Sequence, residues 1–182
     1  WYCQLWAESL GKRKDTAGRD VFVGGTPVKA LGATDQHSQV QLYTEGPFDK
    51  VITLVRVERF AKELPIPALY GEVDALSYLG GKTFGQLLEA ERRGTELALT
   101  EAGRMNLTIT LPEVSAHTIG QLFFALELAT AVAGGLYGID AFNQPGVEAG
   151  KIATYALMGR SGYEDKAHEI ENQPARDPRY VL

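Results

Sequence analysis

Apolar and polar residues along the chain follow strand-like and helix-like patterns in turn. Residues 51–57, VITLVRV, are β-branched and almost continuously apolar, which predicts a strand covered on both faces, as in a parallel sheet. NLTITL, residues 106–111, predicts a second strand that ends at Pro112. Helical patterns occur at residues 1–9, 34–45, 83–103, from 115 onward, and from 145 to about 159. Strands alternating with helices predict an α/β fold, a three-layer α/β/α sandwich with a mainly parallel sheet and a C-terminal helical segment.

Local signals define the ends of these elements and the segments between them. Thr83 precedes a helical pattern, and Gln86 follows at the spacing of a capping box. Residues 10–20 are rich in charge and glycine and predict an exposed loop, whereas residues 21–30 predict extended structure with a turn at Gly24 and Gly25. Residues 64–76 are predicted to be irregular. The tail, residues 163–182, is charged and is predicted to be loosely packed or to wrap a partner.

The segment AFNQPGVEAGKIATYAL, residues 141–157, predicts a helix that Pro145 opens. Its polar residues share one face, on which Glu148 and Lys151 are spaced to form an ordinary surface ion pair. The polar residues are Gln144, Glu148, Lys151 and Tyr155. The opposite stripe is apolar and is predicted to pack on a core; it consists of Ala149, Ile152, Ala153 and Ala156.

The longest apolar stretch, residues 119–138, is interrupted by Gln121 and Glu127 and ends in glycines. A membrane span favours about 20 residues with few or no charges, so we expect the packed face of a long soluble helix instead. That face would consist of Ile119, Leu122, Phe123, Leu126 and Ala133.

Composition and charge limit the classes of function. The chain has 182 residues, of which 45% are hydrophobic and 23% charged, as expected of a single globular domain. Its net charge of -5 gives no general attraction to nucleic acid or to an anionic membrane. The single Cys3 and the lack of a signal segment favour the cytoplasm. Because the chain begins at Trp1 rather than Met, we expect a piece of a longer protein.

Metal and nucleotide chemistry have no support in the sequence. The chain has one Cys and three His, at positions 37, 117 and 168, and none of them is at ligand spacing with another. No Walker lysine loop, GxGxxG fingerprint or GxSxG elbow is present. We therefore expect neither a metal site nor a cofactor.

Two short clusters could carry proton chemistry. Gln4 and Glu8 lie one helical turn apart, and Glu8 is followed by a glycine-containing turn that could partly desolvate its carboxylate and suit it to act as a general base. His37 lies early in a predicted helix, with Gln41 one turn on. The plainer interpretations are a solvated surface glutamate and a structural histidine. Taken singly, these clusters do not identify an enzyme.

Three motifs together resemble the phosphoglucose isomerase (glucose-6-phosphate isomerase) family, most closely its bacterial members. They are ESLGK near the start, GATDQHSQVQL after it, and GLYGIDAFNQPGVEAGK late in the chain. The last motif matches the C-terminal signature of that family at Gly134, Leu136, Tyr137, Phe142, Asn143, Gln144, Gly146, Val147, Glu148 and Lys151. The resemblance extends from Trp1 to about Gly162.

The resemblance implies the fold, the reaction and the roles of individual residues. Residues 1–162 would be the second of two sugar-isomerase (SIS) domains, followed by a tail at 163–182. The family interconverts glucose 6-phosphate and fructose 6-phosphate without a cofactor, by ring opening and proton transfer through a cis-enediol. By resemblance, Glu8 is the catalytic base, His37 and Lys151 assist ring opening, and Gln4 and Gln144 line the substrate site.

The resemblance also implies partners. The family forms homodimers in which the histidine reaches the neighbouring subunit's active site. The loop that grips the substrate phosphate, and an arginine that stabilises the enediolate, would lie in a first domain upstream of Trp1. We therefore expect the 182-residue chain alone to have negligible isomerase activity. The alternative is a noncatalytic sugar-phosphate-binding SIS module, against which the joint presence of Glu8, His37 and Lys151 argues.

Overall fold

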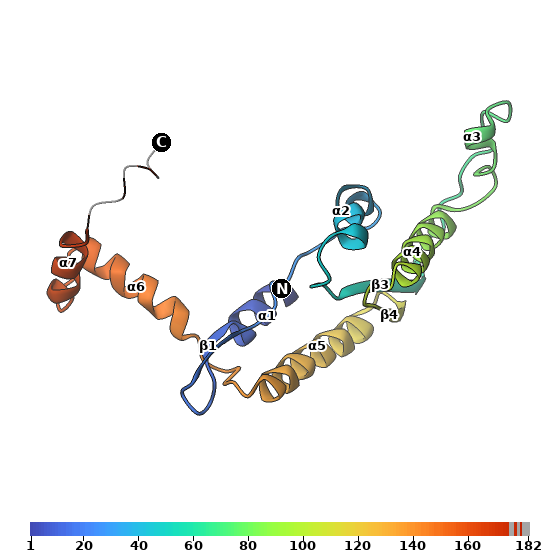
Figure 1. Ribbon diagram of the computed structural model, residues 1–182. Helices are drawn as coiled ribbons and strands as arrows, with labels where there is room; N and C mark the ends of the chain where they lie inside the picture. Colours follow the sequence, from blue (N-terminus) through green and yellow to red (C-terminus); the bar gives the residue numbers. More distant parts are fainter. Residues whose placement is uncertain (175–176, 178, 180–182) are drawn as a thin grey trace. The chain divides into compact units, whose positions relative to one another are not determined.

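The computed structural model describes residues 1–174, 177 and 179 and divides the chain into two compact units. One unit consists of Trp1–Pro27 and the described residues from Glu127 onward, and the other of Val28–Leu126. The division falls within helix α5 (Ala116–Tyr137). Figure 1 shows the elements of each unit along the chain.

The Val28–Leu126 unit contains a pair of parallel strands. Strand β3 (Ile52–Arg59) pairs with β4 (Asn106–Glu113), in register from Ile52 opposite Asn106 to Arg59 opposite Glu113. The predicted parallel pairing is therefore confirmed. The prediction that Pro112 ends its strand is wrong, because β4 continues to Glu113. Proline is compatible with extended backbone and is tolerated near a strand end, where its missing N–H costs little.

The faces of β3 are less covered than predicted. Val55 is 54% exposed, so the described residues do not bury both faces of this strand; Val51, directly before β3, is 60% exposed. Helix α4 (Phe84–Glu101) packs against both β3 and β4, and its Leu99 is completely buried. A short helix, α3 (Asp74–Ser77), interrupts the segment predicted to be irregular.

Helix α4 begins as the sequence predicts. The Thr83 hydroxyl oxygen accepts a hydrogen bond from the Gln86 backbone N–H at 3.2 Å, and the Gln86 side-chain oxygen accepts one from the Thr83 N–H at 2.9 Å. The capping box is therefore confirmed. Further along α4, Glu96 accepts hydrogen bonds from Arg92 at 2.7 Å and from the Thr108 hydroxyl of β4 at 2.9 Å. The bond from Thr108 joins α4 to the sheet.

The other unit has a small apolar core beneath its first helix. Helix α1 (Tyr2–Leu10) leads into strands β1 (Lys12–Lys14) and β2 (Asp20–Val23), which pair antiparallel. The buried core residues are Leu10, Ile139 and Ala141, against which Trp6, Val21, Val23 and Ala133 pack. The loop predicted at residues 10–20 is instead largely this hairpin; Leu10 and Lys12 are buried, whereas residues 16–20 are exposed as predicted.

Two glycines permit the close packing of this core. A Cβ atom at Gly134 would lie 2.6 Å from the Cβ of Ala141, and one at Gly24 would lie 2.6 Å from the Leu10 carbonyl oxygen. Gly24 also has φ of +116°, a backbone conformation that residues other than glycine rarely adopt. Both contacts are possible only without side chains at these positions.

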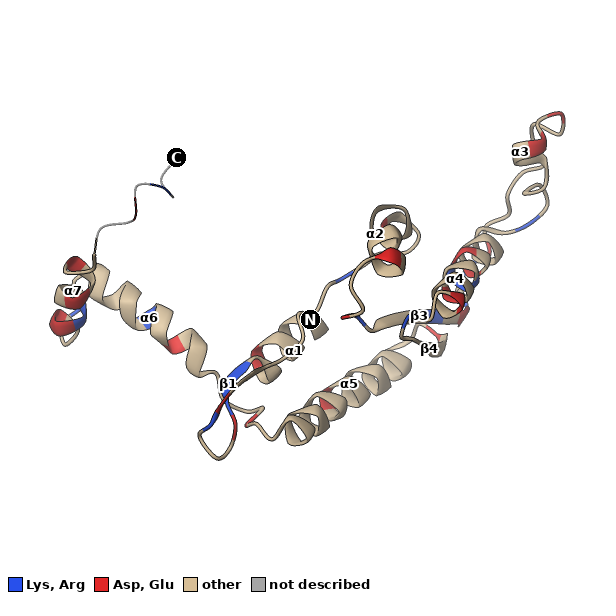
Figure 2. Cartoon of the chain, viewed as in Figure 1, with Lys and Arg blue, Asp and Glu red and all other residues tan. Residues whose placement is uncertain are grey.

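Helix α5 is long and strongly apolar. Figure 2 shows it almost entirely in the colour of uncharged residues. By length and composition alone it could cross a membrane, and only 11% of its most apolar 18-residue stretch is buried in the described residues. The core helix of a globular protein meets the same requirements, so one such helix is weak evidence for a span. Of the predicted packed face, Phe123 is exposed, whereas the other members are half-buried: Ile119, Leu122, Leu126 and Ala133.

The C-terminal elements are helices α6 (Pro145–Leu157) and α7 (Glu164–Glu171), which pack together. Pro145 lies in the first turn of α6, as predicted. Of the predicted apolar stripe, Ala156 is buried and Ala153 half-buried, whereas Ala149 and Ile152 are exposed. Helix α7 occupies part of the segment predicted to be a loosely packed tail.

The β1–β2 hairpin gives a prediction about pH. Hydrogen bonds from Arg13 and Lys14 lower the pKa of Asp20 from 3.8 to about 2. A lowered pKa stabilises the folded hairpin above pH 3.8, and this contribution is lost as the pH falls through about 2. Titration of the Asp20 carboxyl carbon by NMR should therefore give a midpoint near 2.

Arg13→Gln should raise this midpoint toward 3.8, because it removes the largest of the interactions that lower it. Arg19→Gln is the matched control, since Arg19 pairs with Asp15 instead. A midpoint near 3.8 in the unsubstituted protein would contradict the ion-pair geometry.

Candidate active site

The Glu8 carboxylate accepts hydrogen bonds from two glutamines. The Gln4 side-chain amide, one helical turn earlier on α1, donates to one carboxylate oxygen at 3.2 Å. The Gln144 amide, 136 residues away in sequence, donates to the other oxygen at 3.2 Å. Three of the five predicted site residues therefore lie together. Glu8 is exposed in this chain, so the predicted partial desolvation is not observed here.

The segment before α6 brings Gln144 to Glu8. Ile139 and Ala141 are anchored in the apolar core, and between them Asp140 accepts hydrogen bonds from the Phe142 backbone N–H at 2.9 Å and the Asn143 side-chain amide at 2.7 Å. Gln144 is the N-cap residue of α6, but its side chain makes no capping bond. Its side-chain nitrogen donates to Glu8 instead.

Lys151 lies on α6, in the same unit as Glu8. Its ammonium group pairs with Glu148 at 2.8 Å, the contact expected from the spacing. The hydrogen bond from Lys151 to Glu148 raises the pKa of Lys151 above its ordinary value of 10.5. This contact favours the charged form of Lys151, which can stabilise negative charge.

His37 lies in the other unit, on helix α2 (Thr34–Glu45), whose bounds agree with the prediction. The histidine is exposed, and none of the α2 residues is buried. Polar contacts hold this helix in place. The Gln36 side-chain amide donates to the Thr95 hydroxyl at 2.6 Å and to the Glu91 carbonyl at 3.1 Å, both on α4. At the other end of α2, Arg104 donates to the Thr44 carbonyl at 2.7 Å.

The turn before α2 is also fixed by hydrogen bonds. The Asp35 backbone N–H donates to the Leu31 carbonyl at 2.7 Å, and its carboxylate accepts from the Leu31 N–H at 2.6 Å. The bond from Leu31 lowers the pKa of Asp35. This reciprocal pair fixes the segment that immediately precedes His37.

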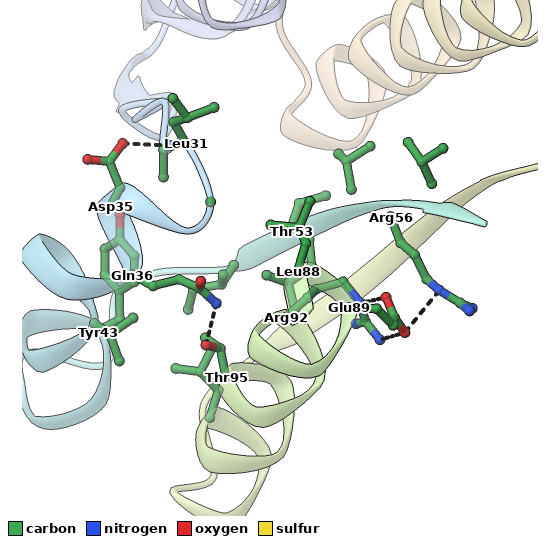
Figure 3. Close-up of a pocket in the computed structure, with 18 of the residues that line it drawn as sticks. Leu31, Asp35, Gln36, Tyr43, Thr53, Arg56, Leu88, Glu89, Arg92 and Thr95 are labelled. Atoms are coloured by element: carbon green, nitrogen blue, oxygen red, sulfur yellow. Dashed lines mark hydrogen bonds and ion pairs between the residues drawn. The ribbon is translucent and has the colours of Figure 1, made fainter. Parts of the chain in front are cut away.

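A cavity of about 360 Å³ lies between α2, β3 and α4. Figure 3 shows Gln36 and Thr95 joined at its margin, and Arg92, Glu89 and Arg56 grouped at another part of its wall. The remaining wall is mainly apolar and includes Val40, Leu88 and Leu99. Val40 and Tyr43 of α2 both line this cavity and are half-buried.

The sequence prediction missed one residue beside Glu8. Lys12, assigned to an exposed loop, is only 6% exposed, and its ammonium group donates to the Glu8 backbone carbonyl. The only sequence signal was its place in ESLGK, four residues after Glu8. Among the described residues, no group of three or more His, Cys, Asp or Glu side chains could hold a metal ion.

Similar proteins are known in sequence and in structure. Residues 1–168 match the phosphoglucose isomerase family. The chain is 51% identical over 182 residues to the glucose-6-phosphate isomerase of Carboxydothermus hydrogenoformans, covering all of this chain and 39% of that protein. It is 53% identical over 163 residues to the enzyme of Rubrobacter xylanophilus, covering 90% of this chain and 36% of that protein. The chain therefore spans less than two fifths of the length of these relatives.

Solved structures extend the similarity to the fold. A hypothetical protein from Thermus thermophilus has a TM-score of 0.80 and 47% identity, covering 87% of this chain and 37% of that one. A glucose-6-phosphate isomerase from Chlamydia trachomatis has a TM-score of 0.69 and 20% identity, covering 94% and 34%. The second likeness concerns the fold alone. Together with the parallel β3–β4 pair, these similarities confirm the predicted α/β fold class.

The polar attachment of α2 gives a testable prediction. Gln36→Ala removes two hydrogen bonds to α4, and one net hydrogen bond contributes about 1 kcal/mol. Amide hydrogen exchange in α2, measured by mass spectrometry, should therefore accelerate about fivefold or more. Gln41→Ala is the matched control, because Gln41 is exposed and bonds only within α2, to Glu45. Equal exchange in the two variants would show that the Gln36 contacts do not hold the helix.

Proposed function

Because the chain belongs to the phosphoglucose isomerase family, we propose that it is the C-terminal part of a longer isomerase that interconverts glucose 6-phosphate and fructose 6-phosphate. Residues 1–162 form the second sugar-isomerase domain in this proposal, and residues 163–182 form its tail. A first domain supplies the phosphate-binding residues. The 182-residue chain by itself is then inactive.

The observation that carries this proposal is the position of Glu8 between two glutamine amides. Gln4 and Gln144 donate to different oxygens of the carboxylate. A positioned carboxylate can act as a general base. In the open-chain aldose, Glu8 takes the proton from C2 while the aldehyde oxygen gains a proton, which gives a cis-enediol. Glu8 then returns its proton to C1 while the C2 hydroxyl loses its proton, which gives the ketose.

Ring opening comes before this step and needs different groups. A proton must leave the anomeric hydroxyl and another must reach the ring oxygen. His37 is exposed, and an imidazole can both accept and donate a proton. Lys151 is cationic, because its contact with Glu148 raises its pKa. In the proposal His37 and Lys151 work together at the ring, and Gln4 and Gln144 also contact the sugar.

The proposed enzyme is a cytoplasmic homodimer with shared active sites and needs no cofactor. The sharing would place His37 of one subunit at the site that contains Glu8 of its partner. Placement of His37 and Glu8 in separate units of the chain is compatible with this arrangement. The alternative function is a noncatalytic sugar-phosphate-binding module. Such a module would need neither a base such as Glu8 nor ring-opening groups such as His37 and Lys151, so their joint presence favours the enzyme.

The base assignment predicts the effect of Glu8→Gln in the full-length protein that contains this chain. The substitution keeps the size of the side chain but removes the proton acceptor, so kcat should fall about a hundredfold or more. Coupled-enzyme assay of fructose 6-phosphate formation measures the rate. Glu171→Gln, an exposed glutamate on α7, is the matched control and should retain the rate.

A rate within about threefold of the unsubstituted protein would show that Glu8 is not the base. If the unsubstituted full-length protein binds sugar phosphate but does not isomerise it, the noncatalytic alternative is correct. The 182-residue chain is assayed in parallel, and measurable turnover by that chain alone would contradict its proposed dependence on a first domain.

The ring-opening assignment predicts a selective defect in His37→Ala. Loss of the imidazole should reduce turnover of the cyclic substrate about a hundredfold, since a general acid or base typically contributes that much. Turnover of open-chain substrate, measured by rapid mixing before the ring closes, should change much less. His168→Ala, on α7, is the control. An equal loss on both substrate forms would contradict a role in ring opening.

A further inference from the structure

Lys12 is a buried cation that the proposed mechanism does not use. Lys12 is 6% exposed, whereas Arg13 and Lys14, the other residues of strand β1, are exposed. Burial lowers the pKa of Lys12, whereas the charge of Asp140 raises it. A buried charge is unfavourable unless other groups compensate it, so the contacts of Lys12 indicate what the residue does.

The ammonium group binds the end of the helix that carries Glu8. It donates to the Glu8 backbone carbonyl at 3.0 Å and to the Ser9 carbonyl at 2.7 Å. The last carbonyls of an α-helix have no partners within the helix, and a cation at this end is favourable. Gly11 ends α1, and the chain then turns so that Lys12 can reach back to both carbonyls.

The same ammonium group is also linked to the segment that carries Gln144. Asp140, which interacts electrostatically with Lys12, accepts the hydrogen bonds from Phe142 and Asn143 that shape this segment. Gln144 follows directly and donates to the Glu8 carboxylate. Lys12 therefore binds the end of α1 where Leu10 packs with Ile139 and Ala141, next to the segment that carries Gln144.

We propose that Lys12 is a positioning residue for Glu8, holding the end of α1 in register with the segment that carries Gln144. It does not touch the substrate; it acts through the backbone of α1 at Glu8 and Ser9. The inference rests on the proposed function, because the positioned group is the proposed base. It adds a residue whose loss should affect proton transfer between C2 and C1 as strongly for open-chain as for cyclic substrate.

Lys12→Met in the full-length protein tests the inference. Methionine keeps the apolar stem and removes the charge and all hydrogen-bond donors. The kcat should fall about tenfold to a hundredfold with KM within about twofold, as expected of a displaced catalytic group, and equally on open-chain and cyclic substrates. Lys14→Met is the matched control, since Lys14 lies two residues further along β1 with a side chain 55% exposed. It should leave kcat unchanged.

A double variant separates positioning from a general loss of stability. If Lys12 acts through Glu8, adding Lys12→Met to Glu8→Gln should lower kcat no further than Glu8→Gln alone. If the two losses instead multiply, Lys12 does not act through Glu8. A kcat within about threefold of the unsubstituted protein in Lys12→Met would also overturn the inference. Should Lys12→Met not yield folded protein, Lys12→Gln, which is too short to reach both carbonyls, is judged by the same criteria.

A crystal structure of Lys12→Met provides a measurement that does not depend on activity. The Gln144 to Glu8 contact, 3.2 Å here, should lengthen beyond hydrogen-bond range in Lys12→Met and remain in Lys14→Met. An unchanged contact in Lys12→Met would overturn the inference. If the unsubstituted full-length protein has no isomerase activity, the proposed function fails, and this structural comparison alone decides whether Lys12 positions Glu8.

Discussion

The hydrogen bond from Gln144 to Glu8 joins two segments that are 136 residues apart, and the candidate site depends on it. A single exposed hydrogen bond of this kind contributes little stability, so other contacts must bring the two residues together. The buried side chains of Leu10, Ile139 and Ala141 do this. Leu10 lies two residues after Glu8, and Ala141 lies three residues before Gln144. The apolar core therefore fixes the ends of both segments, and the amide and the carboxylate meet above it.

The two units fix their functional residues by different means. In the first unit, apolar packing and the buried Lys12 hold the end of α1. In the second, α2 has no buried residue, and its position depends on polar contacts such as those of Gln36 and Arg104. A helix attached in this way moves more easily than one anchored by apolar burial. The proposed base is thus carried by a firmly packed element, and the proposed ring-opening histidine by a more loosely attached one.

Large apolar side chains remain exposed in both units, including Val55 on β3 and Leu136 on α5. Two parallel strands form a small sheet, whereas parallel sheets are normally covered on both faces. The chain spans 39% of the length of its relative from Carboxydothermus hydrogenoformans. The exposed faces are consistent with the proposal that the active enzyme needs more polypeptide than these 182 residues.

The sequence by itself determined the features that depend on neighbouring residues. Helix α2, the capping box at Thr83 and the opening of α6 at Pro145 all follow from local periodicity and hydrogen bonding. Family membership also followed from short motifs. Only the tertiary structure decided that Gln144 meets Glu8 and that Lys12 is buried, because the path of the backbone and the packing of distant segments determine both. A charged, glycine-rich stretch predicts exposed side chains. Lys12 is buried instead, because its ammonium group donates to the last carbonyls of α1, which have no partner within the helix.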